Sequence, residues 1–408
     1  MVDPPRELPR GTLRPEGTPF EVLRAFLTLG LTSFGGPVAH LGYFRDELVT
    51  RRKWVGEKEY ADLVALSQFL PGPASSQVGF ALGLVRAGPL GALAAWLAFT
   101  LPSAILMVAF AYGAGFFDNV VGNGILTGLK IVAVAIVAQA VWGMARALTP
   151  DARRASIAVG AALIVLFFAG SIGQVAAIAI GALAGLALCR TGTTEIAGAL
   201  PFAVSRRAGV VSLTLFVALL VCLPIAANLW PSTTLDVADG FYRAGALVFG
   251  GGHVVLPLLE AEVVTGGSVT AQEFLVGYGA AQAVPGPLFT FAAYLGALAA
   301  PGLAGLWTAA VALVAVFLPG FLILVGVLPF WNSFRTRPRA QSLMRGANAA
   351  VVGILAAALY DPVFVTAIVD GATFGLGLVC FVLLISWRTP PWVVVIVGAV
   401  GGVALTAL

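Results

Sequence analysis

The residues of this sequence best suited to bind a ligand surround two kinds of helix-breaking motif. Residues 71–73 read Pro-Gly-Pro; Ser75 and Ser76 follow them, and Gln68 precedes them by three residues. Glycine and proline interrupt helices because glycine loses backbone entropy and proline lacks an N–H donor. A helix that restarts after such a break presents unpaired N–H groups and the positive end of its dipole, which suit an anion. The neighbouring hydroxyl and amide groups could donate further hydrogen bonds to an oxyanion.

Both helix-breaking motifs occur twice in the same order, which indicates an internal duplication. Phe-Gly-Gly stands at residues 34–36 and 249–251, and Pro-Gly-Pro at residues 71–73 and 285–287. Gln282 precedes the second Pro-Gly-Pro as Gln68 precedes the first. In a membrane protein, segments broken by glycine and proline at corresponding positions of two repeats are typical of a transport site. For any single break, a packing kink satisfied by neighbouring helices is the alternative.

Lys130 is the clearest charged residue inside an apolar segment, and its repeat equivalent is the neutral Asn348. One fixed positive charge at membrane depth would attract a dianion. The alternative is a lysine that snorkels to the interface, because only about six residues precede it in its apolar segment. The predicted substrate-binding residues combine these two positions with the breaks: Gly35, Gly36, Gln68, Pro71, Gly72, Pro73, Ser75, Ser76, Lys130, Gly250, Gly251, Gln282, Pro285, Gly286, Pro287 and Asn348.

Five titratable residues near the breaks or the segment ends are candidates for proton coupling. His40 and His253 each follow a Phe-Gly-Gly motif. Histidine changes its charge near physiological pH, so either residue would suit proton coupling, although helix packing is the favoured reading for both. Glu260, Glu262 and Asp361 lie near the ends of apolar segments, where the same role is open.

The composition requires that membrane helices position all of these groups. The chain of 408 residues is 59% hydrophobic and 10% charged, whereas a soluble domain has about 25% charged residues. Apolar stretches of roughly 20 residues recur along the chain, which favours helices over an outer-membrane barrel. The sequence contains no HExxH, GxSxG, P-loop or Cys–His pattern, so we expect neither an enzyme nor a cofactor or metal site. The three cysteines are expected to act as small hydrophobic residues.

Thirteen apolar elements divide into six per repeat and one unpaired linker. The predicted fold is an all-α polytopic membrane protein, with two homologous six-element halves joined by a linker helix. An odd linker crossing would place the halves in inverted topology, as in many secondary transporters. The expected organisation is a disordered tail at 1–19, a first repeat at 20–190, a linker at 191–230 and a second repeat at 231–408.

The distribution of basic residues predicts the topology. Most Lys and Arg residues lie in short loops that fall on one side, so they indicate the cytoplasmic face, including the N-terminus, and not a nucleic-acid partner. One segment does not fit this rule if every element spans the membrane. Residues 45–58 hold five basic residues and would lie outside the cell, whereas their counterpart, residues 260–273, holds none and would lie inside. Re-entrant hairpins at the Phe-Gly-Gly and Pro-Gly-Pro elements would reverse both assignments. We expect the hairpins; full spans, or an interfacial amphipathic helix at residues 45–60 that would explain the basic segment, are the alternatives.

With these motifs and their spacing in both halves, the chain resembles the chromate ion transporter family in its long, two-domain form. The resemblance covers residues 20 to 408. It implies an inner-membrane transporter that exports chromate, with sulfate as the natural structural mimic. The halves differ where Gly252-His253 replaces Pro37-Val38, which puts equal roles for the two hairpins in doubt.

Two other classes of function stay open beside secondary anion transport. The first is transport of another small anion or a neutral solute, and the second is an intramembrane enzyme or scaffold. The expected partners are a chromate or sulfate oxyanion and the lipid bilayer, without nucleic acid. A homodimer is an open alternative to a monomer, and neither direction nor coupling ion follows from the residues.

Overall fold

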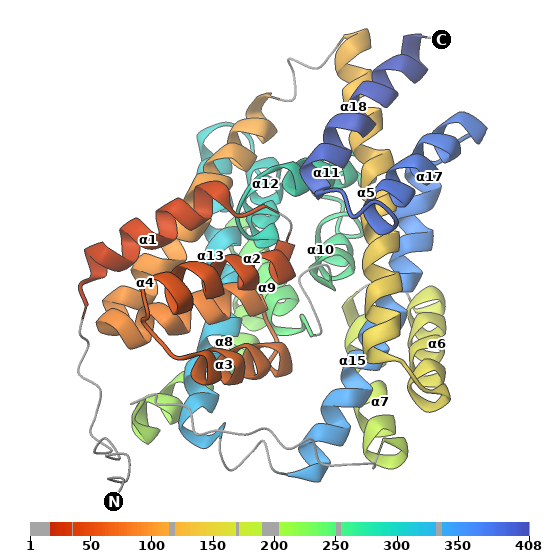
Figure 1. Ribbon diagram of the computed structural model, residues 1–408. Helices are drawn as coiled ribbons and strands as arrows, with labels where there is room; N and C mark the ends of the chain where they lie inside the picture. The colour runs from red at the N-terminus through yellow and green to blue at the C-terminus, as the bar shows by residue number, and fades with distance from the viewer. Residues whose placement is uncertain are drawn as a thin grey trace, which may run out of the picture.

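The structure is a computed structural model that describes residues 17–34, 36–113, 119–168, 171–189, 204–249, 254–331 and 337–407. This part of the chain is helical throughout, as the composition predicts (Figure 1). Within it, five segments are long and apolar enough to cross a membrane. They are residues 74–113, 120–148, 206–229, 303–330 and 338–367.

The chain folds back at the first Phe-Gly-Gly break. Helix α1 (Pro19–Thr32) ends before the break, and α2 (Gly36–Phe44) begins within it. The rings of Phe26 and Phe44 lie 5.4 Å apart, whereas in one continuous helix these residues would be about 27 Å apart along the axis. The segment is therefore a helical hairpin.

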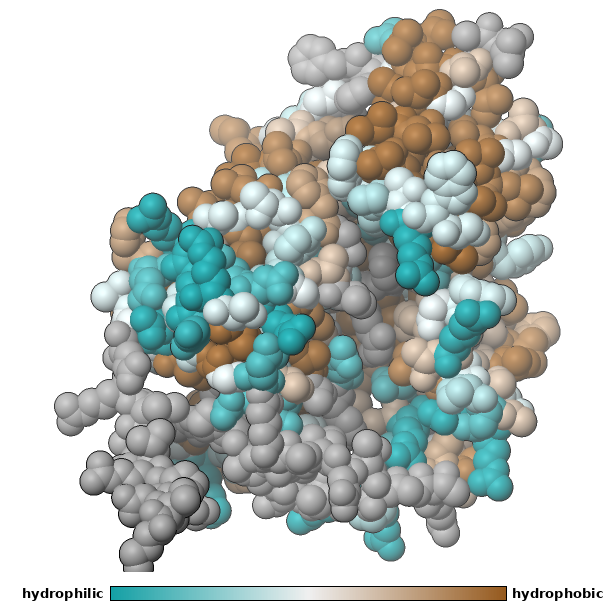
Figure 2. Space-filling view, viewed as in Figure 1, coloured by the Kyte–Doolittle hydropathy of each residue, from teal (hydrophilic) through white to brown (hydrophobic). Residues whose placement is uncertain are grey.

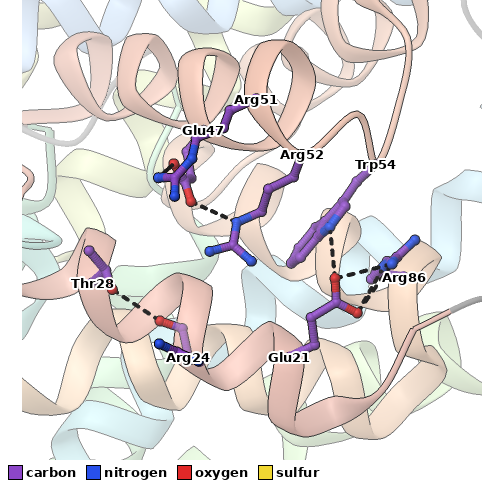
Figure 3. A network of polar contacts seen from close by, with 8 residues as sticks. All are labelled: Glu21, Arg24, Thr28, Glu47, Arg51, Arg52, Trp54 and Arg86. Atoms are coloured by element: carbon purple, nitrogen blue, oxygen red, sulfur yellow. Dashed lines mark hydrogen bonds and ion pairs between the residues drawn. The ribbon is translucent and has the colours of Figure 1, made fainter.

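A polar cluster shows that the first Pro-Gly-Pro element is also a hairpin. After the π-helix η1 (Arg45–Arg51) come α3 (Glu57–Phe69) and α4 (Ala74–Gly113). The Glu21 carboxylate accepts a hydrogen bond from Trp54 Nε1 at 3.2 Å and pairs with Arg86 at 3.1 Å (Figure 3). Those residues stand at the start of α1, just before α3, and after the Pro-Gly-Pro break in α4. Both elements thus begin and end at one place. Hydrophilic residues gather on the side of the molecule formed by α1 to α4, at the left of Figure 2.

Helix α4 reverses direction within its length. Ala87 and Gly88 leave helical geometry, and a Cβ on Gly83 would lie only 2.8 Å from the Cβ of Ala95. Along a straight helix these two positions would be about 18 Å apart. Helix α4 therefore consists of two antiparallel arms, and Pro89 suits the first turn of the second arm, where no N–H donor is needed.

The second repeat forms the same two hairpins. Its helices are α9 (Thr233–Ala246), α10 (Val255–Val263), α11 (Ala271–Ala283), η4 (Leu288–Thr290), α12 (Phe291–Leu298), α13 (Leu303–Val327) and η5 (Leu328–Phe330). Arg243 of α9 pairs with Glu262 of α10 at 3.3 Å, across the Phe-Gly-Gly break. The Tyr294 hydroxyl of α12 donates to the carbonyl oxygen of Glu273 in α11 at 3.0 Å, across the Pro-Gly-Pro break. We call these four structures the break hairpins.

The remaining helices, in order, are α5 (Val120–Leu148), α6 (Ala152–Phe167), α7 (Ser171–Leu188), α8 (Arg206–Leu229), α15 (Pro338–Ala358), η6 (Leu359–Phe364), α16 (Val365–Ala367), α17 (Gly371–Ile385) and α18 (Pro391–Ala407). Helix α8 packs on α9 and α13, and the others form a bundle in which the two repeats interlock. Helix α5 packs on α18, and its equivalent α15 packs on α7. Small residues allow this close approach: a Cβ on Gly128 would lie 2.6 Å from the carbonyl carbon of Gly398, and one on Gly346 would lie 2.7 Å from the Cα of Gly185. The hairpins α1–α4 lie at the left of Figure 1 and this bundle at the right.

Candidate functional site

The breaks of the two repeats meet in two equivalent pairs. The Gly72 N–H of the first Pro-Gly-Pro donates to the carbonyl oxygen of Val248 at 2.7 Å, directly before the second Phe-Gly-Gly. The Gly286 N–H of the second Pro-Gly-Pro donates to the carbonyl oxygen of Ser33 at 2.8 Å, directly before the first Phe-Gly-Gly. Each Pro-Gly-Pro loop therefore binds the Phe-Gly-Gly hairpin of the other repeat, and the four predicted breaks form one region.

Two side chains that follow or face the breaks brace the Pro-Gly-Pro loops. Gln77 Nε2 donates to the carbonyl oxygens of Pro71 and Gly320, each at 2.9 Å. Ser103 Oγ donates to the carbonyl oxygen of Pro285. Gly320 follows a proline inside α13, as Ser103 follows one inside α4. Each loop is thus fastened to the proline-containing helix of the opposite repeat.

His40 lies beside the first Pro-Gly-Pro break and also packs against a neighbouring ring, so helix packing and proton coupling both stay open for it. Its side chain is 1% exposed, and its Nδ1 lies 3.4 Å from Ser75 Oγ, so α2 contacts the start of α4. The ring stands edge-on to Phe99 at 5.2 Å between centroids. The tautomer of neutral His40 decides whether its Nδ1 donates a hydrogen bond to Ser75 Oγ or accepts one from it. His253 lies outside the described residues.

Several buried polar atoms beside the breaks have no protein partner. Within the described chain they include Ser33 Oγ, His40 Nε2, Ser67 Oγ, Ser76 Oγ, Gln77 Oε1, Thr100 Oγ1 and Gln282 Nε2. A buried polar group left unsatisfied costs about 1–3 kcal/mol, and hydrocarbon offers it no partner. Hydroxyl, imidazole and amide groups of this kind can donate to an oxyanion or to water. Their gathering at the meeting point of four breaks fits a polar ligand site better than four independent packing kinks.

Lys130 lies deeper in its helix than its apolar segment predicts. Helix α5 begins at Val120, so Lys130 lies about 15 Å along the helix axis from its start. The expected interval of about six residues was too short because the polar Gly122-Asn123 start of α5 is helical as well. A Cβ on Gly279 would lie 3.0 Å from the carbonyl carbon of Leu129, and Gln282 follows one turn later in α11. Lys130 is half-buried beside the helix that leads to the second Pro-Gly-Pro.

The other predicted site residues differ in their surroundings. Gln68 is exposed at the end of α3, whereas Gln282 is half-buried and its side chain is hydrogen-bonded to Tyr278. The two glutamines therefore do not have the matching environments that their sequence positions predict. Asn348 is half-buried in α15, and its Oδ1 has no partner in the described chain. Gly35, Gly250 and Gly251 lie outside the described residues. Among the residues that the structure describes, no group of three or more His, Cys, Asp or Glu residues could hold a metal ion.

Comparison with known proteins identifies the same two repeats. A family model described as "Chromate transporter" matches residues 20–186 and 235–403, and each match contains two of the break hairpins. A "Probable chromate transport protein" of Synechococcus elongatus is 27% identical over 410 residues, which cover 94% of both chains. A "Chromate transport protein" of Pseudomonas aeruginosa is 28% identical over 404 residues, covering 93% of this chain and 90% of the relative. One of Cupriavidus metallidurans with the same description is 28% identical over 386 residues, covering 93% and 91%. No solved structure matches the chain.

Proposed function

The chain belongs to the chromate transporter family, and from this premise we propose that it is a secondary transporter that exports chromate and accepts sulfate as a structural mimic. The observation that carries the proposal is the pairing of the breaks, Gly72 with Val248 and Gly286 with Ser33. This pairing brings the hydroxyl and imidazole groups beside the first-repeat breaks toward the Gln282 amide of the second repeat. Tetrahedral dianions need several donors arranged around one centre, and such a site meets that need.

The transport step in this proposal requires no covalent chemistry. Donors at the breaks replace water around the dianion, and Lys130 supplies a positive charge from α5. Alternating access follows if one pair of hairpins separates while the other stays closed. The Gly72–Val248 and Gly286–Ser33 hydrogen bonds are the contacts that opening on either side would break. Because these two bonds are equivalent under the duplication, the two open states would have similar energies, as a reversible transporter requires.

The proposed topology places the break hairpins as re-entrant elements in an inner membrane. The first repeat, residues 20–190, enters from the cytoplasm, so the cluster of Glu21, Trp54 and Arg86 lies at the cytoplasmic interface together with the N-terminus. The linker, residues 191–230, crosses once through α8. The second repeat, residues 231–408, then enters from the outside, in inverted orientation. The hairpin tips meet near the midplane, which the inter-repeat hydrogen bonds support.

Single-cysteine labelling is expected to place residue 50 inside the cell and residue 265 outside. Thr50 in η1 and Thr265 in the turn after α10 are both exposed, and each lies between the two hairpins of its repeat. Thr265 is preferable to the nearby Gly267, whose φ of +77° a cysteine would adopt only with strain. In a variant that lacks Cys189, Cys222 and Cys380, an impermeant maleimide should label Thr265→Cys on intact spheroplasts. It should label Thr50→Cys only after lysis. The reverse pattern would place the hairpin ends of the first repeat outside the cell and would overturn the proposed orientation.

Uptake into inverted membrane vesicles tests the function itself. Labelled chromate should accumulate above the level in vesicles that lack the protein, and sulfate should compete, because both are tetrahedral dianions of similar hydrogen-bonding capacity. Labelled sulfate and molybdate, each with and without an imposed pH gradient, separate the substrate from the coupling ion. Uptake of none of the three anions by vesicles that contain folded protein would contradict the proposal and favour a neutral solute.

A further inference from the structure

A basic cavity lies away from the breaks, where the α5–α6 turn meets the end of α7 and the start of α15. It encloses about 690 Å³, and its described lining contains Arg153, Arg154 and Arg345 with one carboxylate, Asp151. The charge of this lining is therefore +2. Hydrophilic residues gather in this region, at the lower right of Figure 2, over the ends of α6 and α7.

The arginines are held in place by backbone at the end of α7. Arg153 Nη1 donates to the carbonyl oxygen of Leu188 at 3.1 Å, and Arg345 Nη1 contacts that of Cys189 at 3.5 Å. Arg154 pairs with Asp151 at 2.6 Å. Capping of the negative end of α7 is a sufficient structural reason for one donor of Arg153 and one of Arg345. A guanidinium has five N–H donors, however, so Arg153 retains capacity for an anion in the cavity.

An apolar groove continues from this cavity along the outer surface of the bundle. The groove runs between α6 and α7, encloses about 250 Å³, and shares Leu188 with the cavity. Ile157, Gly160, Ile164 and Ile180 are among its walls. A Cβ on Gly160 would meet no atom within 4 Å, so the groove is open at its middle.

We propose that this cavity and groove bind one anionic phospholipid. Its phosphodiester lies at Arg153 and Arg345, and one acyl chain lies in the groove against Gly160. The charge of the cavity selects an anionic head group, as basic pockets between membrane helices do. A free oxyanion would use the arginines alone and would leave the groove without a role. The continuity of the two surfaces through Leu188 therefore favours the lipid.

Native mass spectrometry of the purified protein tests both halves of this site. The probes are phosphatidylglycerol and phosphatidylcholine with the same acyl chains. The double variant Arg153→Gln/Arg345→Gln should bind phosphatidylglycerol about thirtyfold more weakly, since each arginine near a membrane surface contributes about 1 kcal/mol. Gly160→Phe should fill the groove and weaken binding as well. Phosphatidylcholine should bind weakly to every form.

Two matched controls leave the site intact. Arg206→Gln/Arg207→Gln removes two exposed arginines at the start of α8, and Gly143→Phe places a ring at another open position on a helix. Both should retain phosphatidylglycerol as the unaltered chain does. Unchanged binding in the double arginine variant would overturn the proposal. So would displacement of the lipid by inorganic phosphate together with no effect of Gly160→Phe, because that result assigns the cavity to a free oxyanion. Lipid retention is measured without transport, so the result of this test does not depend on the result of the chromate uptake assay.

Discussion

Gly72→Ala and Gly286→Ala are each expected to lower chromate uptake about tenfold or more. Both glycines adopt positive φ, +121° and +94°, where a side chain costs about 1–2 kcal/mol. A Cβ on Gly72 would lie 2.8 Å from Gln77 Nε2 and 2.9 Å from the Cα of Gly320. Relief of that contact requires the loop to move away from the opposite repeat. Since 1.4 kcal/mol corresponds to a factor of ten, the backbone strain alone is of the right size.

The substitution at Gly286 should act by the same route in the other repeat. Its Cβ would collide with Ser103 Oγ and lie 3.1 Å from the carbonyl oxygen of Phe99. Gly143→Ala is the matched control, because that position is open and should transport normally. Initial uptake rates in inverted vesicles, normalised to the folded protein recovered by gel filtration, separate a damaged site from a loss of protein. Normal kinetics in both glycine variants would make the breaks simple packing kinks.

Lys130→Gln is expected to raise the KM for chromate at least about fivefold while the protein remains folded. Two unit charges 4 Å apart interact by about 4 kcal/mol at an effective dielectric constant of 20, and a quarter of that value already corresponds to about fivefold. The charge is half-buried and lies about 15 Å into α5, so water screens it less than a surface lysine. Removal of the charge should weaken attraction of a dianion more than that of a monoanion.

Two further variants make the result on Lys130 specific. Lys130→Arg keeps the charge and should retain most of the affinity, whereas Lys53→Gln removes an exposed lysine near the hairpin ends and should have little effect. KM and maximal rate are measured at several sulfate concentrations, with the thermal unfolding temperature as the check on folding. An unchanged KM in Lys130→Gln would leave the lysine as an interfacial side chain without a role in binding.

The positions of the breaks could be predicted from the sequence because helix breaking depends on the local chemistry of glycine and proline. The surroundings of the side chains predicted beside them do not follow from local chemistry in the same way. Gln68 and Gln282 have equivalent places in the repeats, yet one is exposed and the other is hydrogen-bonded to Tyr278. His40 was read as a packing residue, and its contact with Ser75 appears only when two hairpins are brought together.

Composition and repetition alone determined that this protein is a helical membrane protein with two homologous halves and matched breaks. Hydropathy and helix breaking are properties of each residue and its near neighbours, so they can be read along the chain. Only the tertiary structure decided that each Pro-Gly-Pro loop binds the opposite repeat, through Gly72 with Val248 and Gly286 with Ser33. These bonds join backbone groups distant in sequence, and every residue carries the same N–H and carbonyl groups except proline, which lacks the N–H. Their pairing therefore depends on packing, for which the sequence holds no local signal.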